Sequence, residues 1–570
     1  MRSFIEVLRD NAVHTDRAVT FMRANGEERR VSYPDLWIEA QRRAHALLSH
    51  GLTKGDRVAL ILPEPDEFVL TFIAALSAGI VAVPMYPPQT LAKMEAYGET
   101  VRHVLAASGA KLVVTNDSLE PLIRDHLLAD QSHAKLVLER DARGAPGSEE
   151  TPLPTVELED LAFLQFTSGS TSKPKGVMVT HRNLSVNSHA IMFDGLRSTP
   201  EDRGVSWLPL YHDMGLIGFV IAPLYALVQV MFLPTMAFIR RPSLWLEAIH
   251  RFRGTITFAP NFAYALATRA VTETQAQHWD LSCMRALGCG AEPIQADVLR
   301  GFLQRFQKNG LRPESALPSY GMAEATLAVT FWDVTKEIVT DRIDLAAMKH
   351  GRADQAGASA SMELVCCGKP FPGHEIRVLG PAGDLGHRQV GEILLRGPSV
   401  TAGYFGNADA TTDSFRDGWL RTGDLGYTTP DGLYLCGRAK DLIILNGKNY
   451  YPQDIEAIVS RVEGIRDMQC VAFSKLDEHG AEIAVVVAEA RKASQALCDA
   501  IVRAVRSELG LTIGEVHLIK RSTLPKTSSG KVRRREAKLR LESGELELLT
   551  EIISDGALGS AGQSAPPAAE

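Results

Sequence analysis

The sequence has no excess of positive charge, no paired-cysteine motif and no leading apolar segment. It carries 61 lysines and arginines against 68 aspartates and glutamates, a net charge of −7. Nucleic-acid-binding proteins usually carry a basic surplus, so we expect no nucleic-acid partner. The seven cysteines are odd in number and include no C-x-x-C pair. This disfavours a disulfide framework or a zinc site and favours a reducing compartment, the cytoplasm.

Long apolar runs are also scarce, and neither end of the chain supplies one. Charges at Arg2 and Glu6 exclude the apolar core of a signal peptide. Residues 214–239 carry no formal charge over about 26 residues, more than the roughly 20 that a bilayer requires. Pro223 and Pro234 interrupt this stretch, and a buried helix followed by a buried strand explains it equally well. We therefore predict no transmembrane segment.

Length and periodicity indicate an α/β protein of two or more domains. A chain of 570 residues exceeds what one compact core usually holds. Helical and strand patterns alternate near the N-terminus: a helix over residues 33–51, a strand over 56–62, a helix over 65–79 and a strand over 80–84. This alternation predicts a doubly wound, mainly parallel sheet. Active sites in such sheets lie at the carboxyl ends of the strands.

One loop at such a strand end is rich in hydroxyl groups and poor in bulk. Residues 163–179 read FLQFTSGSTSKPKGVMV, an apolar strand that runs into serine, threonine and glycine and then into Lys173 and Lys175. Small residues let backbone N–H groups approach an anion, and hydroxyls add donors, so the loop is suited to phosphate. It is not the G-x-x-x-x-G-K-[ST] loop, because a strand pattern follows it. A solvated hairpin has the same composition, so the loop alone leaves the function open.

Six further strings place glycine, aromatic or charged residues beside predicted strands and loops. They are residues 206–215 (SWLPLYHDMG), 286–293 (ALGCGAEP), 319–324 (SYGMAE), 419–426 (WLRTGDLG), 437–442 (GRAKDL) and 524–531 (LPKTSSGK). Singly, each has an ordinary explanation: His212 as a packed loop histidine, Glu324 as an exposed carboxylate, Lys531 as part of a basic surface loop. Together, the strings favour a common site.

With TSGSTSKPKGV, these strings resemble the motifs of the adenylate-forming superfamily, which holds acyl-CoA synthetases, luciferases and peptide-synthetase adenylation domains. The resemblance implies that ATP phosphates are bound by Thr167, Ser168, Gly169, Ser170, Thr171 and Lys175. It implies that the nucleoside is bound by Gly290, Ala291, Glu292, Tyr320, Gly321, Met322, Ala323, Asp424 and Arg438. Glu324 would hold Mg²⁺, a hard cation that prefers carboxylate oxygen. His212 would lie beside the substrate carboxylate and Lys531 between that carboxylate and the α-phosphate.

The resemblance also implies a division of the chain. It predicts a large N-terminal domain, residues 1–437, of doubly wound sheets with a β-barrel-like subdomain, and a hinge over 438–441 centred on Lys440. A small, mobile α+β domain would follow over 442–555 and carry Lys531. The remaining tail, residues 556–570, is rich in glycine, alanine, serine and proline and is expected to be disordered.

Three strings narrow the resemblance to the fatty acyl-AMP ligases: Tyr86-Pro87-Pro88, WLPLYHDM over residues 207–214, and NGKNYYPQDIE over 446–456. In that branch an insertion packs against the N-terminal domain and is thought to limit the movement needed for coenzyme A thioesterification; residues 333–365 match its place. Lys175 departs from the branch, many of whose members lack this lysine.

The predicted activity is therefore ATP- and Mg²⁺-dependent adenylation of a medium- or long-chain fatty acid, with residues 214–239 lining an apolar tunnel. Transfer to the phosphopantetheine of an acyl carrier protein would follow. No carrier domain follows residue 556, so we expect the carrier to be a separate chain. A fatty acyl-CoA ligase is the first alternative. An amino-acid adenylation domain is disfavoured by the string around His212, and a non-catalytic adenylate- or lipid-binding protein by the presence of Glu324, Asp424 and Lys531.

Overall fold

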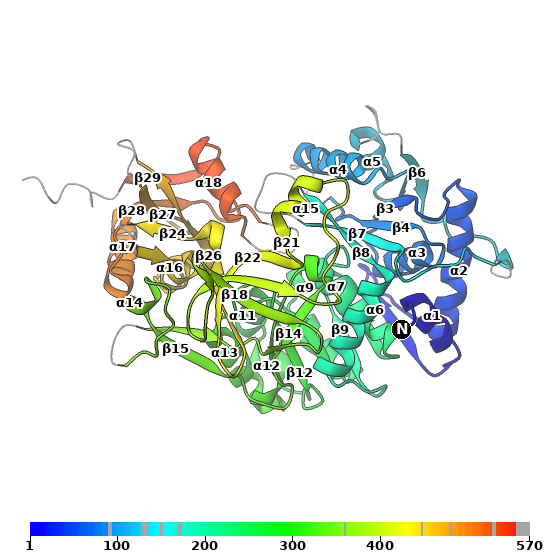
Figure 1. Ribbon diagram of the computed structural model, residues 1–570, viewed down its shortest axis with the longest axis horizontal. Coiled ribbons are helices and arrows are strands. Elements are labelled where there is room, and N and C mark those ends of the chain that lie inside the picture. The colour runs from blue at the N-terminus through cyan, green and yellow to red at the C-terminus, as the bar shows by residue number, and fades with distance from the viewer. Residues whose placement is uncertain are drawn as a thin grey trace, which may run out of the picture.

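A computed structural model of the chain describes residues 1–88, 94–127, 134–148, 152–167, 174–357, 361–445, 448–477, 482–526 and 532–553. Figure 1 shows a large body built from the first three quarters of the chain, with a smaller lobe, coloured orange to red, at one end. Two α/β layers and an antiparallel sheet make up the large body. The smaller lobe has its own apolar core, separate from that of the large body.

The first layer is the predicted doubly wound sheet. Its order is β6-β5-β3-β4-β7-β8, with β3 (Arg57–Ile61), β4 (Val81–Pro84), β5 (Leu112–Thr115), β6 (Lys135–Leu138), β7 (Leu161–Thr167) and β8 (Lys175–Thr180). All neighbours are parallel except β7 and β8. Side chains alternate between two cores: Leu60 packs on the side of α2 (Tyr33–Ser49) and α3 (Pro65–Ser77). Ala59 and Ile61 pack with α4 (Met94–Ser108) and α5 (Glu120–Leu127). Because successive side chains of a strand point to opposite faces and both sets are apolar, helices must cover both faces of this sheet.

A second, larger sheet is parallel through its centre. Its order is β17-β14-β13-β12-β11-β9-β10-β1-β2, with β1 (Ala18–Met22), β2 (Glu28–Ser32), β9 (Arg203–Ser206), β10 (Gln229–Phe232), β11 (Ile256–Ala259), β12 (Ala286–Cys289), β13 (Ala316–Gly321), β14 (Ala328–Phe331) and β17 (Lys369–Pro370). Its helices include α10 (Ser243–Phe252), α11 (Asn261–Ala270) and α13 (Ala296–Phe306). On β11, the Thr257 hydroxyl accepts a hydrogen bond of 2.9 Å from the Trp245 indole of α10. The ring of the next residue, Phe258, packs against Phe219 on the opposite face of the sheet.

The uncharged stretch predicted to be a buried helix and strand is confirmed as such. It forms α7 (Asp213–Leu216), the π-helical turn η4 (Ile217–Ile221), α8 (Ala222–Tyr225) and β10, and then a further helix, α9 (Thr235–Arg240). The buried helix α6 (His181–His189) packs against η4 and α8. No helix in the described part of the chain is long and apolar enough to cross a membrane.

The region predicted to be a β-barrel-like subdomain contains an antiparallel sheet. It contains β18 (Glu375–Gly380), β19 (Gly383–Asp384), β20 (Gly391–Arg396), β21 (Phe415–Arg416), β22 (Trp419–Thr428) and β23 (Leu433–Arg438). The predicted insertion forms a hairpin of β15 (Thr340–Asp344) and β16 (Ser361–Val365) around α14 (Leu345–Met348). The hairpin packs on the large body, where Tyr427 donates to Asp341 at 2.8 Å.

The small lobe is a four-stranded sheet with helices on both faces. Its elements are β24 (Ile443–Leu445), β25 (Lys448–Tyr450), α16 (Pro452–Ser460), β26 (Ile465–Leu476), β27 (Glu482–Ala490), α17 (Gln495–Leu509), β28 (Ile513–Ile519), α18 (Arg534–Glu542) and β29 (Leu548–Ile553). Val486 faces α16 and α17, and its neighbours Val485 and Val487 face α18. The predicted α+β architecture of this lobe is confirmed, whereas the tail from residue 556 lies outside the described residues.

Candidate active site

The hydroxyl-rich loop closes a hairpin at the carboxyl edge of the first sheet. β7 and β8 pair with Thr167 opposite Lys175, so the two ends of the loop are fixed side by side. Ser168, Gly169, Ser170 and Thr171 lie outside the described residues. The strand–loop–strand arrangement predicted from the sequence is confirmed, and the phosphate-binding role of the loop stays a prediction.

Two neighbouring parallel strands of the second sheet bring the predicted nucleoside-binding strings together. β12 ends at Cys289 and β13 runs to Gly321, and Cys289 pairs with Pro318. The turn after β12 is tight: a Cβ added at Gly290 would lie 2.6 Å from the Ser319 hydroxyl, and Ala291 adopts a left-handed φ of +70°. Gly290 therefore permits close approach of the two strings, Gly290-Ala291-Glu292 and residues 320–323.

Tyr320, Asp424 and Arg438 form a contiguous chain of hydrogen bond and ion pair. The Tyr320 hydroxyl donates to Asp424 Oδ2 at 2.8 Å, and Arg438 Nε lies 3.2 Å from Asp424 Oδ1. β22 and β23 supply the last two, paired across the strands at Asp424 and Arg438. The Asp424 carboxylate raises the pKa of Arg438, and burial raises the pKa of Tyr320. The Asp424 carboxylate is thus oriented by two neighbouring donors, Tyr320 and Arg438.

Glu324 lies immediately after the β13 string, in a desolvated position. Its Oε1 accepts a hydrogen bond of 2.8 Å from the hydroxyl of Tyr404. Burial raises the pKa of Glu324, and the nearby Asp213 carboxylate adds to the rise. Lys175 lies over the Tyr404 ring, with Nζ 5.0 Å from its centroid. Tyr404 is a residue that the sequence reasoning missed; its only local signal is an aromatic residue after Gly403.

Glu324 fits the predicted magnesium site in its chemistry. Mg²⁺ binds through oxygen and in nucleotide enzymes takes one or two carboxylates, with phosphates and water completing its shell. Among the described residues no group of three or more His, Cys, Asp or Glu side chains could hold a metal by itself. A single desolvated carboxylate therefore suits a cation that arrives with phosphate.

The string around His212 borders a cavity between the two α/β layers. Gln165 of β7 donates to the Tyr211 carbonyl at 3.0 Å and so attaches this loop to the strand that leads into the hairpin. His212 caps the start of α7, and its ring lies 5.2 Å from that of Tyr211, which in turn lies 6.1 Å from Tyr86. The structure thus joins His212 to the Tyr86-Pro87-Pro88 string, although the two are far apart in sequence.

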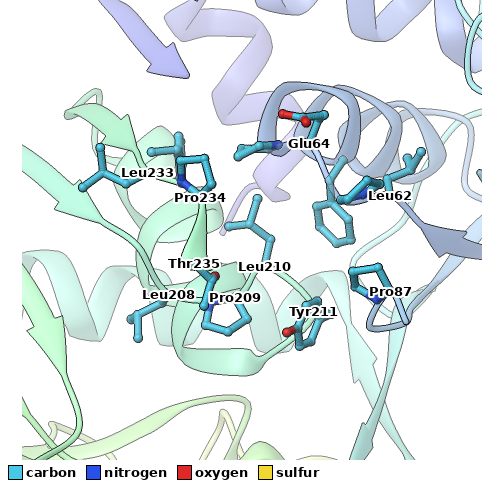
Figure 2. Close-up of a pocket in the computed structure, with 14 residues that line it drawn as sticks. Leu62, Glu64, Pro87, Leu208, Pro209, Leu210, Tyr211, Leu233, Pro234 and Thr235 are labelled. Atoms are coloured by element: carbon cyan, nitrogen blue, oxygen red, sulfur yellow. The ribbon is translucent and has the colours of Figure 1, made fainter. Parts of the chain in front are cut away.

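The cavity has a volume of about 50 Å³ and is mainly apolar. Figure 2 shows Leu62, Glu64 and Pro87 on one side, facing the 208–211 loop and residues 233–235 on the other. It is smaller than the roughly 300–1,000 Å³ of typical small-molecule sites, so it would have to widen to hold an acyl chain. The helical part of the predicted tunnel segment, residues 216–224, is buried in the core instead. The cavity is therefore lined by the residues flanking that helix rather than by the helix.

The residues predicted to form the hinge lie at the junction with the small lobe, and their role as a hinge stays a prediction. Lys440 is exposed in the 3₁₀ turn η8 (Ala439–Asp441). Arg534 of α18 forms ion pairs with both Asp441 and Glu456, the latter at 2.7 Å. On the other side of the lobe, Lys349 of the insertion donates to the Leu509 carbonyl at 2.9 Å. The insertion thus contacts the small lobe as well as the large body, a contact that the sequence did not predict.

The two residues that flank the segment carrying Lys531 lie side by side. Lys526 and Val532 form an antiparallel bridge, and the Arg533 amide donates to the Pro525 carbonyl at 2.8 Å. Lys531 itself lies outside the described residues. The surrounding basic residues are largely paired: Lys520 lies 3.3 Å from Glu547, and Arg533 pairs with Glu536. These ion pairs reduce the positive charge that the basic surface loop presents.

Comparison with known proteins agrees with this geometry. The profile of the AMP-binding enzyme family matches residues 8–405, and that of the Disco-interacting protein 2-like AMP domain matches residues 440–550. A provisionally named acyl-CoA synthetase of Caulobacter vibrioides is 37% identical over 516 residues, 89% of each chain. The medium-chain-fatty-acid–[acyl-carrier-protein] ligase JamA of Moorena producens is 31% identical over 563 residues, 93% of each chain.

A solved structure shares the whole architecture. It comes from a study of fatty acyl-adenylate ligases of E. coli and L. pneumophila, and it superposes with a TM-score of 0.90 at 36% identity. The match covers 96% of this chain and 98% of that one. The resemblance to fatty acyl-AMP ligases predicted from the motifs is therefore confirmed. The chain belongs to the AMP-binding enzymes, a family of AMP-forming ligases.

Proposed function

We propose that this enzyme activates a medium- or long-chain fatty acid as its acyl-adenylate and passes the acyl group to the phosphopantetheine of a separate acyl carrier protein. The observation that carries the proposal is that strings predicted to bind the nucleotide meet in space, since Tyr320 and Arg438 both contact Asp424. The mainly apolar cavity lined by Tyr211 would be the start of an acyl tunnel. JamA, matched over 93% of this chain, is named for transfer to a carrier protein.

The chemistry needs a carboxylate oxygen brought in line with the α-phosphate, because a carboxylate is a weak nucleophile and negative charge accumulates as it attacks. Asp424 would hold the ribose and Tyr320 the base. Binding of the nucleoside would therefore hold the α-phosphate in the orientation that the attack requires. Lys175 and the hairpin amides would stabilise charge on the phosphates, and Lys531 charge at the reacting centre. Glu324 would hold Mg²⁺, which neutralises phosphate charge when bound. Pyrophosphate would leave as the mixed anhydride forms.

The lobes have separate roles in this proposal. The large body, residues 1–437, would bind ATP and the fatty acid, and the small lobe would bring Lys531. A hinge at Lys440 would let the lobe withdraw after adenylation so that a thiol can approach. The insertion, residues 333–365, touches both lobes and would limit that withdrawal.

The test is incubation with ATP, Mg²⁺ and saturated fatty acids of increasing length, with coenzyme A or a holo carrier protein as acceptor. We expect pyrophosphate release with acyl-adenylate accumulation, and an acylated carrier protein by mass. Acyl-CoA as the main product would favour the first alternative, to which the Caulobacter relative's provisional name points. Binding of acyl-adenylate by the parent without pyrophosphate release from ATP and any fatty acid would favour the non-catalytic adenylate- or lipid-binding protein.

A further inference from the structure

A tyrosine outside all of the predicted motifs joins two parts of the candidate site. Tyr404 is 8% exposed, and its hydroxyl donates to Glu324 Oε1 at 2.8 Å. The face of the same ring lies 5.0 Å from Lys175 Nζ, within the range of a cation–π interaction. One side chain therefore contacts both Glu324, the carboxylate predicted to bind metal, and Lys175, which begins β8 after the hydroxyl-rich loop.

The backbone holds Tyr404 in this position. Residues 403–405 pair with β8 as a short extra strand: Met178 donates to the Gly403 carbonyl at 3.0 Å and Phe405 to the Gly176 carbonyl at 2.8 Å. The Tyr404 amide donates to the Thr411 hydroxyl at 3.0 Å. Gly403 is required there, because its φ is +129° and a Cβ would lie 2.4 Å from Thr411. The ring is thus fixed relative to the phosphate hairpin.

The contact also fixes Glu324 from two directions. The Glu324 carbonyl accepts from the Thr401 amide at 2.9 Å, so the 401–405 segment holds both its backbone and its side chain. A phenol on Oε1 restricts the carboxylate to one rotamer and leaves Oε2 as the oxygen for a cation. Orienting a ligating carboxylate by an outer hydrogen bond raises metal affinity, and losing such a bond typically costs 10- to 100-fold.

We propose that Tyr404 is the positioning residue that sets Glu324 for a metal–nucleotide complex and holds Lys175 beside the same phosphates. The hydroxyl acts on the metal through Glu324, and the ring acts on the phosphates through Lys175. The two actions are separable, because Tyr404→Phe removes only the first and Tyr404→Leu removes both. This inference rests on the proposed binding of Mg²⁺ and ATP but not on the identity of the acyl substrate.

The experiment measures binding without turnover. Mn²⁺ is the metal probe, followed by electron paramagnetic resonance in the presence of α,β-methylene-ATP. We expect Tyr404→Phe to weaken Mn²⁺ binding about tenfold with analogue affinity in excess metal little changed. We expect Tyr404→Leu to weaken analogue binding as well. Mn²⁺ affinity of Tyr404→Phe within twofold of the parent would overturn the proposal.

The matched control is another tyrosine–carboxylate pair. Tyr427 donates to Asp341 Oδ2 at the same 2.8 Å, in the insertion rather than the site. We expect Tyr427→Phe to lower Tm without changing Mn²⁺ affinity; an equal loss in both variants would show a general stability effect and contradict the proposal. If Tyr404→Phe fails to fold, Thr411→Val removes the acceptor of the Tyr404 amide and should still weaken Mn²⁺ binding several-fold. Absence of pyrophosphate release by the parent would refute the proposed function without affecting this binding measurement.

Discussion

The large body and the small lobe hold their parts of the site in different ways. In the large body, each charged or phenolic group of the nucleotide region is paired within the body: Tyr320 and Arg438 with Asp424, and Tyr404 with Glu324. The contacts of the small lobe with the rest of the chain include the ion pair of Arg534 with Asp441, the hydrogen bond of Lys349 to the Leu509 carbonyl, and the buried side chain of Tyr451. The large body is therefore a preformed template, and we predict that the small lobe moves relative to it to bring Lys531 to the site.

The largest expected effect tests what the small lobe contributes. Lys531→Ala should lower adenylate formation by at least about 100-fold, because an ammonium at the reacting centre stabilises charge that develops only in the transition state. Affinity for α,β-methylene-ATP should stay within a few-fold, since the large body holds the nucleotide. Radiolabelled pyrophosphate exchange measures the first and calorimetry the second.

The control for this variant comes from the same segment of the lobe. Lys526 pairs with Gln469 at the base of the segment. Lys526→Ala should leave pyrophosphate exchange within a few-fold of the parent. If Lys531→Ala weakened binding of the analogue as much as it lowered the rate, the small lobe would contribute to nucleotide binding, and the prediction would be wrong.

The next effect tests the template itself. Asp424→Asn keeps the shape of the side chain but removes the charge that Arg438 and Tyr320 share, so we expect KM for ATP to rise about 10- to 100-fold with KM for fatty acid little changed. Steady-state kinetics with each substrate varied separately measures the two. Glu375→Gln is the control, since its pair with Arg396 is exposed on both sides and such pairs contribute little. A parallel rise in both KM values would mean that Asp424 maintains the fold rather than the nucleotide site.

Local patterns were sufficient to predict much of the fold. Strand 56–62 and helix 65–79 match β3 and α3 within two residues, because the flanking glycines and prolines end each element locally. Tyr320 and Glu324 also fall in one region, since their string lies at the carboxyl end of β13 in a sheet that is parallel through its centre. Asp424 reaches the same region from β22 of the antiparallel sheet, through its hydrogen bond with Tyr320.

Long-range contacts could not be predicted in the same way. Tyr404 reaches Glu324 only because residues 403–405 add to β8, a pairing across more than two hundred positions with no periodic signal. The extra helix α9 follows Pro234 within a stretch assigned to a strand, where apolar residues do not distinguish helix from strand. The contact of Lys349 with the small lobe could not be predicted for another reason. Its acceptor is the backbone carbonyl of Leu509, and a backbone group has no sequence signature.

A smaller effect tests the hinge contact. Arg534 holds Asp441 and Glu456 together, and its side chain is 22% exposed. Arg534→Met would leave two neighbouring carboxylates without their shared cation, so we expect a loss of roughly 1–3 kcal/mol in the stability of the small lobe. Hydrogen exchange across α16 and α18, compared with the large body, measures it. Arg461→Met is the control because its pair with Glu508 is exposed; equal exchange in both variants would show that the hinge contact adds no stability.

The smallest expected effect concerns the contact between the insertion and the small lobe. Lys349 donates to the Leu509 carbonyl and lies 5.0 Å from the centre of the Tyr450 ring, so it joins the insertion to the C-terminus of α17 and to β25. Lys349→Met keeps the length of the side chain and removes the donor. We expect about a threefold rise in the share of acyl-CoA over acyl-adenylate when coenzyme A is present, the size of one modest hydrogen bond, with pyrophosphate release unchanged.

Lys336 is the control residue for the Lys349→Met prediction. It belongs to the same insertion but is 66% exposed and lies 3.9 Å from Asp333, within the large body. Lys336→Met removes the same charge from the same segment without touching the small lobe, so product ratios should not move. If both variants raise acyl-CoA equally, the cause is the charge of the insertion rather than the tether, and the small lobe is held at the hinge alone. If neither does, the tether does not restrict the motion that thioesterification needs, and the preference for an acceptor must reside in the thiol's access to the adenylate.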